Sequence, residues 1–295
     1  MRKKVCLLTG ATSGIGQSAA LALAEKGYEL YLVARNRQRA DDTEKLIAAK
    51  VPSVEIHWLF GDLSCLDEVR KLASDFIATG KRLDLLFLNA GVTYNSRTLS
   101  GDGYEMMFAV NHLAPFLLTN LLLEKLCEEG VGAEAERDAG TKNETRIVMT
   151  ASGAYRFVNA LNIDDVNAEK KFSTFSTYGN SKLANILFIR QLSKKLLERA
   201  PYKRFSINCY HPGFVGTNLG TQTAFGKVLM GCLRPFARSS EKGAESGVFL
   251  ATDASLTGCN GGYYYNCRRQ RLLPQAEDDV MAEALWQLSE QLVSA

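Results

Sequence analysis

The residue pair best suited to proton transfer in this sequence is Tyr178 and Lys182, a phenol and an ammonium four positions apart. They lie at the start of an apolar-periodic run that reaches about Leu197, so we expect both to project from one face of a helix. A neighbouring cation favours the phenolate. This predicts a Tyr178 pKa closer to neutrality than the ordinary value of about 10, and a role as general acid or base. A surface tyrosine and lysine on an amphipathic helix is the alternative, which the pair alone does not exclude.

The amino-terminal segment predicts a phosphate-binding turn. An apolar run, Val5-Cys6-Leu7-Leu8, stops at Thr9-Gly10-Ala11-Thr12-Ser13-Gly14-Ile15-Gly16, and an alanine-rich helical stretch follows to Lys26. Glycines let the backbone approach an anion, and the N–H groups and dipole of a helix start favour negative charge. The spacing Gly-x-x-x-Gly-x-Gly differs from the common Gly-x-Gly-x-x-Gly fingerprint, and a plain loop is the alternative.

The end of the second predicted strand, residues 29–34, indicates which dinucleotide would fit. An acidic residue at this place binds the ribose hydroxyls of NAD, whereas an arginine suits the 2′-phosphate of NADP. The strand is followed by Arg35 and no acid. The sequence therefore favours NADP(H) over NAD(H), with Arg37 and Arg39 either as helpers or as the start of a charged surface helix.

Apolar strands and helical segments alternate along the whole chain. Further strands are expected at residues 54–60, 83–88, 146–150, 204–210 and 262–266, with helices between most of them. This alternation predicts an α/β protein, a single Rossmann-type domain over residues 1–295. We expect a doubly wound parallel sheet of about seven strands with helices on both faces. Ligands of such sheets bind at the carboxyl ends of the strands, where the glycine-rich stops fall.

Residues that directly follow these strands are candidates for the site. Asp62 and Leu63 follow the third strand, and Asp62 suits either the cap of the next helix or the adenine. Asn89-Ala90-Gly91 follows the fourth, where small residues let the backbone pack against a cofactor. Ser152 follows the fifth, where it could donate to a substrate oxygen or cap a helix.

Other segments carry weaker signals. Residues 103–126 read as one long apolar helix, in which Asn111 is an oddity and Pro115 predicts a kink. Residues 128–144 are the best candidate for an exposed insertion, and the tetrapeptide at 268–271 for a solvated turn. Residues 218–239 look like a substrate loop or a membrane-touching flap. The C-terminal helix, within 275–295, is expected to serve packing or a dimer contact.

Composition excludes several other classes of protein. A formal charge of +3 and the lack of a basic stripe argue against nucleic-acid binding. The seven scattered cysteines indicate free thiols, and the three histidines form no metal-binding pattern. No apolar run is long enough to cross a membrane. We expect a cytoplasmic protein and leave open a peripheral contact with an intracellular membrane.

The motifs, in their order, resemble the short-chain dehydrogenase/reductase superfamily. They are Thr9-Gly10-x-x-x-Gly14-x-Gly16, Asn89-Ala90-Gly91, Asn111, Ser152 and Tyr178-x-x-x-Lys182. The stretch 178–188 and His211-Pro212-Gly213 look like the retinol dehydrogenase branch. The ending at 262–267 followed by Ala284-Leu285-Trp286 is similar to that branch and to the WW-domain-containing oxidoreductase. Two features depart from the pattern: Leu88 replaces the usual first asparagine before Asn89, and the sequence lacks the amino-terminal membrane anchor of many vertebrate retinol dehydrogenases.

The resemblance implies a role for each matching residue. Tyr178 would be the acid or base, Lys182 would lower its pKa and bind the nicotinamide ribose, Ser152 would polarise the substrate oxygen, and Asn111 would order a water. Five residues of the glycine turn would face the pyrophosphate: Gly10, Ser13, Gly14, Ile15 and Gly16. The other cofactor contacts would be Arg35 with the 2′-phosphate, Asp62 and Leu63 with the adenine, Asn89, Ala90 and Gly91 with the adenine-side ribose, and Pro212, Gly213, Val215 and Thr217 with the nicotinamide end.

The function expected from this resemblance is an NADP(H)-dependent interconversion of an alcohol and a carbonyl. The substrate would be hydrophobic, either retinoid-like or another lipophilic aldehyde or ketone. A reductase of steroids or xenobiotic carbonyls is one alternative, and a dinucleotide-binding redox sensor or scaffold is another. The complete set of Ser152, Tyr178 and Lys182 argues against a scaffold, because a pure binder does not need all three. A homodimer is left open.

Overall fold

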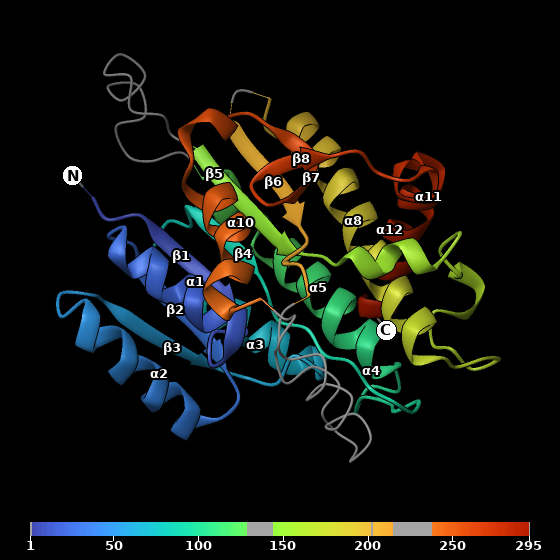
Figure 1. The fold of residues 1–295 in the computed structure, drawn as a ribbon, viewed down its shortest axis with the longest axis horizontal. Coiled ribbons are helices and arrows are strands. Elements are labelled where there is room, and N and C mark those ends of the chain that lie inside the picture. Colours follow the sequence, from blue (N-terminus) through green and yellow to red (C-terminus); the bar gives the residue numbers. More distant parts are fainter. Residues whose placement is uncertain (1, 129–143, 202, 215–237, 295) are drawn as a thin grey trace.

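One eight-stranded sheet organises the protein. The computed structural model describes residues 2–128, 144–201, 203–214 and 238–294, to which all structural statements below refer. The strand order is β3-β2-β1-β4-β5-β6-β7-β8 (Figure 1). The strands are β1 (Val5–Thr9), β2 (Glu29–Ala34), β3 (Ile56–Phe60), β4 (Leu85–Leu88), β5 (Glu144–Thr150), β6 (Arg204–Tyr210), β7 (Asn260–Tyr265) and β8 (Arg268–Gln270). The chain reverses its winding between β1 and β4, so the carboxyl ends of these two strands border a ligand crevice.

Seven of the strands are parallel, and the eighth corrects an expectation. Strands β1 to β7 pair in parallel, whereas β8 pairs antiparallel with β7. The α/β doubly wound prediction is confirmed, but the solvated turn expected at 268–271 was wrong. A two-residue hairpin leads into β8 because Asn266 and Cys267 both adopt left-handed backbone angles, with φ of 50° and 58°.

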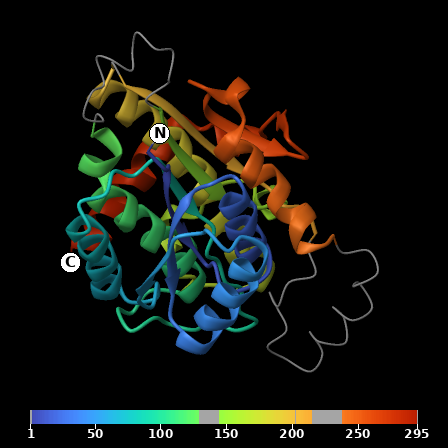
Figure 2. The same cartoon turned by 90° about the vertical axis from the view of Figure 1, so that its left-hand side faces the viewer.

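Helices cover both faces of the sheet (Figure 2). The helices α1 (Gly14–Glu25), α2 (Arg37–Lys50) and α10 (Ser240–Thr252) contribute to one hydrophobic cluster. On the opposite face, α3 (Leu66–Ala78), α5 (Ala114–Leu121), α8 (Thr174–Arg199), the short α11 (Pro274–Glu277) and α12 (Asp279–Ser294) build the larger cluster. The centre of the sheet is thus buried on both sides, which accounts for the apolar sequences of β1 and β4.

The long helix expected over residues 103–126 is interrupted. It consists of α4 (Met106–Phe108), the π-helical turn η1 (Ala109–Leu113), α5 and α6 (Leu123–Cys127). In η1 the N–H of Ala114 donates to the carbonyl of Ala109, five residues back. Pro115 lies in the first turn of α5, where its missing N–H is tolerated. The irregularity therefore falls on Asn111 and not on the proline, as is common for π-turns at functional sites.

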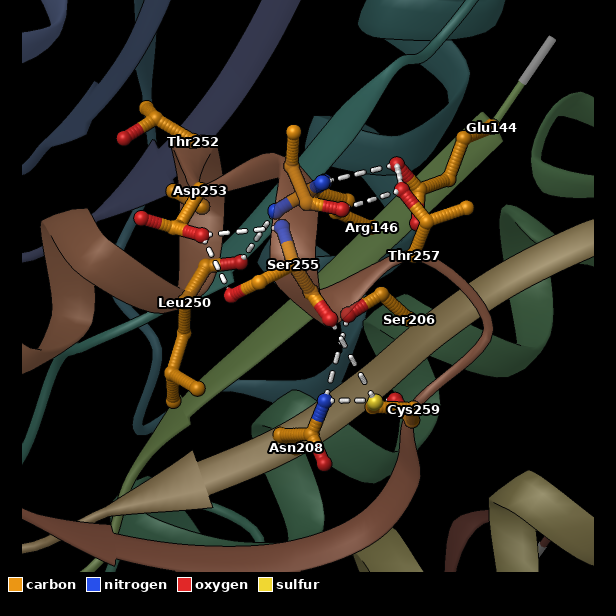
Figure 3. Close-up of polar contacts among 12 residues, drawn as sticks. Glu144, Arg146, Ser206, Asn208, Leu250, Thr252, Asp253, Ser255, Thr257 and Cys259 are labelled. Atoms are coloured by element: carbon orange, nitrogen blue, oxygen red, sulfur yellow. Dashed lines mark hydrogen bonds and ion pairs between the residues drawn. The ribbon is translucent and has the colours of Figure 1, made fainter. Parts of the chain in front are cut away.

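The start of β5 carries a buried ion pair between Glu144 and Arg146 (Figure 3). Ser152 follows the other end of this strand. Arg146 Nη2 lies 2.8 Å from Glu144 Oε2, and both side chains are almost fully buried. Arg146 Nη1 also donates to the carbonyl of Leu250 at 2.9 Å, in the last turn of α10. A cation is favourable at a helix C-terminus, so this contact connects α10 to β5, the strand that Ser152 follows.

Two further predictions have structural outcomes. The six cysteines among the described residues are all free thiols. Of the helices formed by these residues, none has the length and the apolar character that crossing a bilayer requires.

Candidate active site

Tyr178 and Lys182 lie on one face of α8, as their spacing predicts. The Lys182 ammonium is 5.6 Å from the centre of the Tyr178 ring. Lys182 is 2% exposed, whereas Tyr178 is half-buried and keeps part of its surface accessible. A partly accessible phenol beside a buried cation can exchange a proton with a bound molecule.

Ser152 meets Tyr178 from the end of β5. Its hydroxyl lies close enough to the Tyr178 phenol to lower the pKa of that phenol. The Ser152 oxygen also accepts the N–H of Ala154 at 3.2 Å and so caps the 3-10 helix η2 (Gly153–Phe157). Of the two roles that the sequence left open for Ser152, capping is therefore confirmed, and the same hydroxyl lies beside Tyr178. Gly179 lets η2 pack directly on α8, because a Cβ there would lie 2.9 Å from the Ala154 carbonyl oxygen.

Burial controls the protonation of both groups. It raises the pKa of Tyr178 to about 12, although the nearby Ser152 hydroxyl acts in the opposite direction. It lowers the pKa of Lys182 to about 8. The lowered Tyr178 pKa expected from the neighbouring cation is therefore wrong for this structure, because desolvation of the phenol is the largest effect on its pKa. At neutral pH the phenol is protonated and suited to donating a proton.

The Asn111 side chain connects three parts of the site. Its Oδ1 accepts the N–H of Val92 at 2.7 Å, and its Nδ2 donates to the Val92 carbonyl and to the Ser181 hydroxyl, both at 3.0 Å. A Cβ on Gly91 would lie 3.2 Å from Lys182 Nζ and 3.4 Å from Asn111 Oδ1. Asn111, Gly91 and Lys182 are therefore immediate neighbours.

The glycine turn and the Asn89-Ala90-Gly91 segment form one unit. The Thr9 hydroxyl accepts the N–H groups of Asn89 and Ala90 at 3.0 and 3.1 Å. The Asn89 amide donates to the carbonyls of Thr9 and Gly10 at 3.2 and 3.3 Å. A Cβ on Gly16 would lie 2.1 Å from the Gly10 carbonyl oxygen, so no larger residue fits.

This unit suits the phosphates of a dinucleotide. Gly10 and Gly14 have φ of 71° and 53°, angles that favour glycine. Ser13 occupies the N-cap position of α1, and the first turn of α1 carries no acidic residue. Ile15 lies in the same turn. The N–H groups of such a turn have no partner within the helix, so they can bind an anion.

Arg35 and Asp62 lie together at the ends of β2 and β3. Arg35 Nη1 is 3.4 Å from Asp62 Oδ2, and the arginine side chain is 70% exposed. Burial acts to raise the pKa of Asp62, but hydrogen bonds from Ser64 and the charge of Arg35 lower it overall. Asp62 accepts a hydrogen bond from the backbone N–H of Ser64 and does not cap α3. At the start of α3 the backbone N–H of Leu66 instead donates to the Asp102 carboxylate at 2.8 Å.

The remaining predicted residues divide into two groups. Leu63 packs against the larger core cluster, beside the crevice. Pro212 and Gly213 follow β6, where the N–H of Gly213 donates to His211 Nδ1 at 3.1 Å. The His211 ring lies 3.3 Å from the Cβ position of Gly153, so this segment borders the helix that Ser152 caps. Val215, Thr217 and residues 218–237 of the expected substrate loop lie outside the described residues.

Two threonines with structural roles in the site were not predicted. Thr9 holds the Asn89-Ala90-Gly91 segment, and the carbonyl of Thr150 accepts from Lys182 Nζ at 3.2 Å. Both are the last residues of their strands, β1 and β5, and that position was the signal available in the sequence.

The structure also brings together three residues whose atoms could hold a metal ion, away from the site. These are Glu29, Glu55 and His57, whose ligand atoms lie within 4.8 Å of one another. Lys81 already pairs with Glu29, and Lys3 with Glu55, each at 2.9 Å. The carboxylates are therefore neutralised by lysines, and we assign no metal chemistry to this cluster.

Comparisons with known proteins agree with this geometry. The family model described as short chain dehydrogenase matches residues 4–225. Retinol dehydrogenase 14 from Mus musculus is 33% identical over 307 residues, covering 99% of this chain and 86% of its own. The chloroplastic short-chain dehydrogenase TIC 32 B from Brassica napus is 33% identical over 290 residues, covering 98% and 88%. The crystal structure of an uncharacterized protein from Mycobacterium paratuberculosis matches with a TM-score of 0.73 and 27% identity, over 99% of this chain and 94% of that one.

Proposed function

The chain belongs to the short-chain dehydrogenase family, and on this premise we propose that it interconverts an alcohol and a carbonyl on a lipophilic substrate, with NADP(H) as cofactor. The observation that carries the proposal is the meeting of Ser152, Tyr178 and Lys182 beside the glycine turn. When bound, the cofactor supplies the hydride chemistry. The protein supplies binding, orientation and the proton.

Each residue of the site has a role in this reaction. Tyr178, protonated at neutral pH, gives its proton to the carbonyl oxygen during reduction and takes it back during oxidation. The Ser152 hydroxyl lies beside that phenol, lowers its pKa and holds the same oxygen. Lys182 places positive charge beside the phenol as it loses its proton. Donors aimed at a developing oxyanion are the largest contribution to many enzyme rates.

The preference for NADP(H) rests on Arg35. No acidic residue ends β2, and an arginine suits a 2′-phosphate. Its side chain is 70% exposed and pairs with Asp62 at 3.4 Å, a long distance for an ion pair. Such an exposed pair contributes little, so Arg35 can turn toward a phosphate at small cost.

A lipophilic substrate is supported by two exposed aromatic side chains beside the site. Phe175 and Phe157 are 73% and 71% exposed. Phe175 precedes Tyr178 by three residues in α8 and therefore lies on the same side of the helix. Phe157 ends η2, which begins directly after Ser152. The names of several relatives, including retinol dehydrogenase 14, agree with this class of substrate.

The test is NADPH consumption by the purified protein with retinal, medium-chain and aromatic aldehydes, and ketosteroids. We expect turnover with at least one of them. The variant Tyr178→Phe should lose about 10²–10⁴-fold in rate while binding NADPH as before. The control is Tyr28→Phe, which removes a phenol that donates to the Ala251 carbonyl, in the core cluster on the other face of the sheet.

Two results would count against the proposal. Full activity in Tyr178→Phe would remove the tyrosine from the reaction. Tight NADPH binding with no turnover on any substrate would favour a dinucleotide-binding scaffold.

A further inference from the structure

A pocket of about 360 Å³ lies at the far edge of the sheet, between the β7–β8 hairpin, α8 and α11. Gly261 and Tyr263, two residues apart on β7, both line it, so it opens on one face of that strand. Arg190 enters its wall from α8. Arg190 follows Lys182 by eight residues, which places it about 12 Å further along the helix axis. The pocket is therefore separate from the cofactor crevice.

Two residues of the pocket wall each carry a buried polar atom that has no partner among the described residues. Tyr263 is 2% exposed, and its buried hydroxyl makes no hydrogen bond. The Arg190 Nε, also buried, makes none either, although Arg190 Nη2 donates to Asp279 at 2.9 Å. Leaving a buried donor unpaired costs about 1–3 kcal/mol, so two such groups in one pocket require an explanation.

The charge of the wall indicates which kind of ligand would pair with these two atoms. Three arginines line the pocket, Arg190, Arg269 and Arg271, and the one carboxylate among its described lining residues belongs to the exposed Glu277. Guanidinium N–H groups and a phenol O–H are all hydrogen-bond donors, so the partner must be an acceptor. Guanidinium groups are also well suited to binding carboxylates and phosphates.

We propose that this pocket is a second ligand site, which takes a small molecule carrying an oxyanion. The oxyanion would accept from the Tyr263 hydroxyl and Arg190 Nε, with Arg271 at the entrance. The volume exceeds that of a single phosphate or carboxylate group, so the ligand has an organic body as well. Leu272, which is 8% exposed, gives this body an apolar wall.

The test is calorimetric titration of the protein with pyrophosphate and, separately, with citrate, at constant ionic strength. Excess NADPH is present so that phosphate binding in the cofactor crevice does not contribute. We expect one saturable site. Tighter binding of pyrophosphate would indicate a phosphate ligand, and tighter binding of citrate a carboxylate ligand. No turnover is measured, so the result does not depend on the proposed reaction.

Three variants decide whether binding occurs in this pocket. Tyr263→Phe removes only the unpartnered hydroxyl, so it should weaken binding about fivefold. Without the probe, its melting temperature should be no lower than that of the wild type. Arg271→Gln should weaken binding about threefold, because this side chain is exposed. Arg268→Gln is the matched control, an exposed arginine of β8 that does not line the pocket, and should leave binding unchanged.

Several outcomes would overturn the proposal. One is the absence of saturable binding with both probes. Another is an equal loss in Arg268→Gln and Arg271→Gln, which would mean unspecific attraction to a basic edge and an adventitious ion only. A lower melting temperature of Tyr263→Phe without the probe would show that the hydroxyl already has an internal partner.

Discussion

The Lys182 ammonium group lies where folding has removed nearly all of the water around it. The side chain is 2% exposed, and the described partner of its Nζ is the Thr150 carbonyl at 3.2 Å. Burial lowers the pKa of this lysine to about 8 from an ordinary value of 10.5. Between these two values the unfolded chain binds more protons than the folded one, so stability rises with pH. Below pH 8 the charged lysine therefore lowers the free energy of unfolding by its full amount. Such a cost is expected of a residue that takes part in the reaction.

Removing this charge should stabilise the protein at neutral pH. Lys182→Met is expected to raise the free energy of unfolding at pH 7 by up to about 3 kcal/mol. This gain should shrink as the pH rises from 8 toward 10.5, where the wild-type penalty disappears. Urea unfolding at pH 7 and pH 10 measures both values. The exposed Lys171→Met serves as control, and a variant less stable than wild type at pH 7 would contradict the argument.

Arg35 is the residue on which cofactor preference should depend. Arg35→Ser is expected to lower the ratio of kcat/KM with NADPH to that with NADH by at least about tenfold, because a charged hydrogen bond to the 2′-phosphate is lost. Arg39→Ser, in the first turn of α2, is the control and should leave the ratio as it was. An unchanged ratio in Arg35→Ser would exclude this role.

At the scale of elements, the site depends on how closely η2 packs on α8. A Cβ at Gly179 would lie 2.9 Å from the Ala154 carbonyl oxygen and 3.2 Å from Val158 Cγ1. Gly179→Ala must therefore push η2, and Ser152 with it, away from Tyr178 by a few tenths of an ångström. We expect kcat to fall at least about tenfold, because catalysis is sensitive to such displacements.

The controls for this prediction separate position from stability. NADPH affinity in Gly179→Ala, followed by fluorescence titration, should stay unchanged, since the phosphate-binding turn belongs to β1 and α1. Gly101→Ala adds a methyl group where nothing lies within 4 Å and should alter neither quantity. Wild-type kcat in Gly179→Ala would mean that the spacing of η2 and α8 does not limit the reaction.

The sequence predicted most elements because burial of the sheet on both faces makes most of its strands rich in apolar residues. The bounds of β2 and β6 agree with those expected, and Tyr178 and Lys182 share a helix face as their spacing requires. Ser152, Asn89 and Asp62 follow strand ends, so the rule that parallel strands share one carboxyl edge placed them near one another.

The missed features depend on contacts that a local pattern does not encode. The hairpin that leads into β8 bends at Asn266 and Cys267, and neither position holds the glycine that is typical of such turns. The π-turn around Asn111 has no sequence period of its own. The direction of the Tyr178 pKa shift depends on how much water the folded chain removes, which is a property of tertiary packing.

At the scale of the molecule, the C-terminal helix completes the core and leaves little of its apolar side for a partner. Trp286 of α12 is 5% exposed, with its ring centre 5.0 Å from that of Phe116 and 5.8 Å from that of Phe188. Either packing or a dimer contact was expected for this helix, and these contacts show that it packs on the core.

Removing the Trp286 ring should make the protein less stable without changing the residues of the active site. Trp286→Ala is expected to lower the free energy of unfolding by about 3–5 kcal/mol, the usual cost of deleting a buried aromatic ring. Urea unfolding measures this change. Val280→Ala, at a position of the same helix that is 82% exposed, should change the value by less than about 0.5 kcal/mol. Similar losses in both variants would mean that α12 does not pack as described.

The short hairpin at the end of the sheet also limits how copies of this chain can associate. An edge strand offers unpaired backbone groups to another strand, and growth into a filament requires an open strand at both edges of each copy. One edge here is β8, three residues long with two exposed arginines, Arg268 and Arg269. So short and charged a strand is a poor template for any other strand, including β3 of another copy. Among the described residues this leaves β3 as the edge suited to pairing, so strand-to-strand association would stop at a pair.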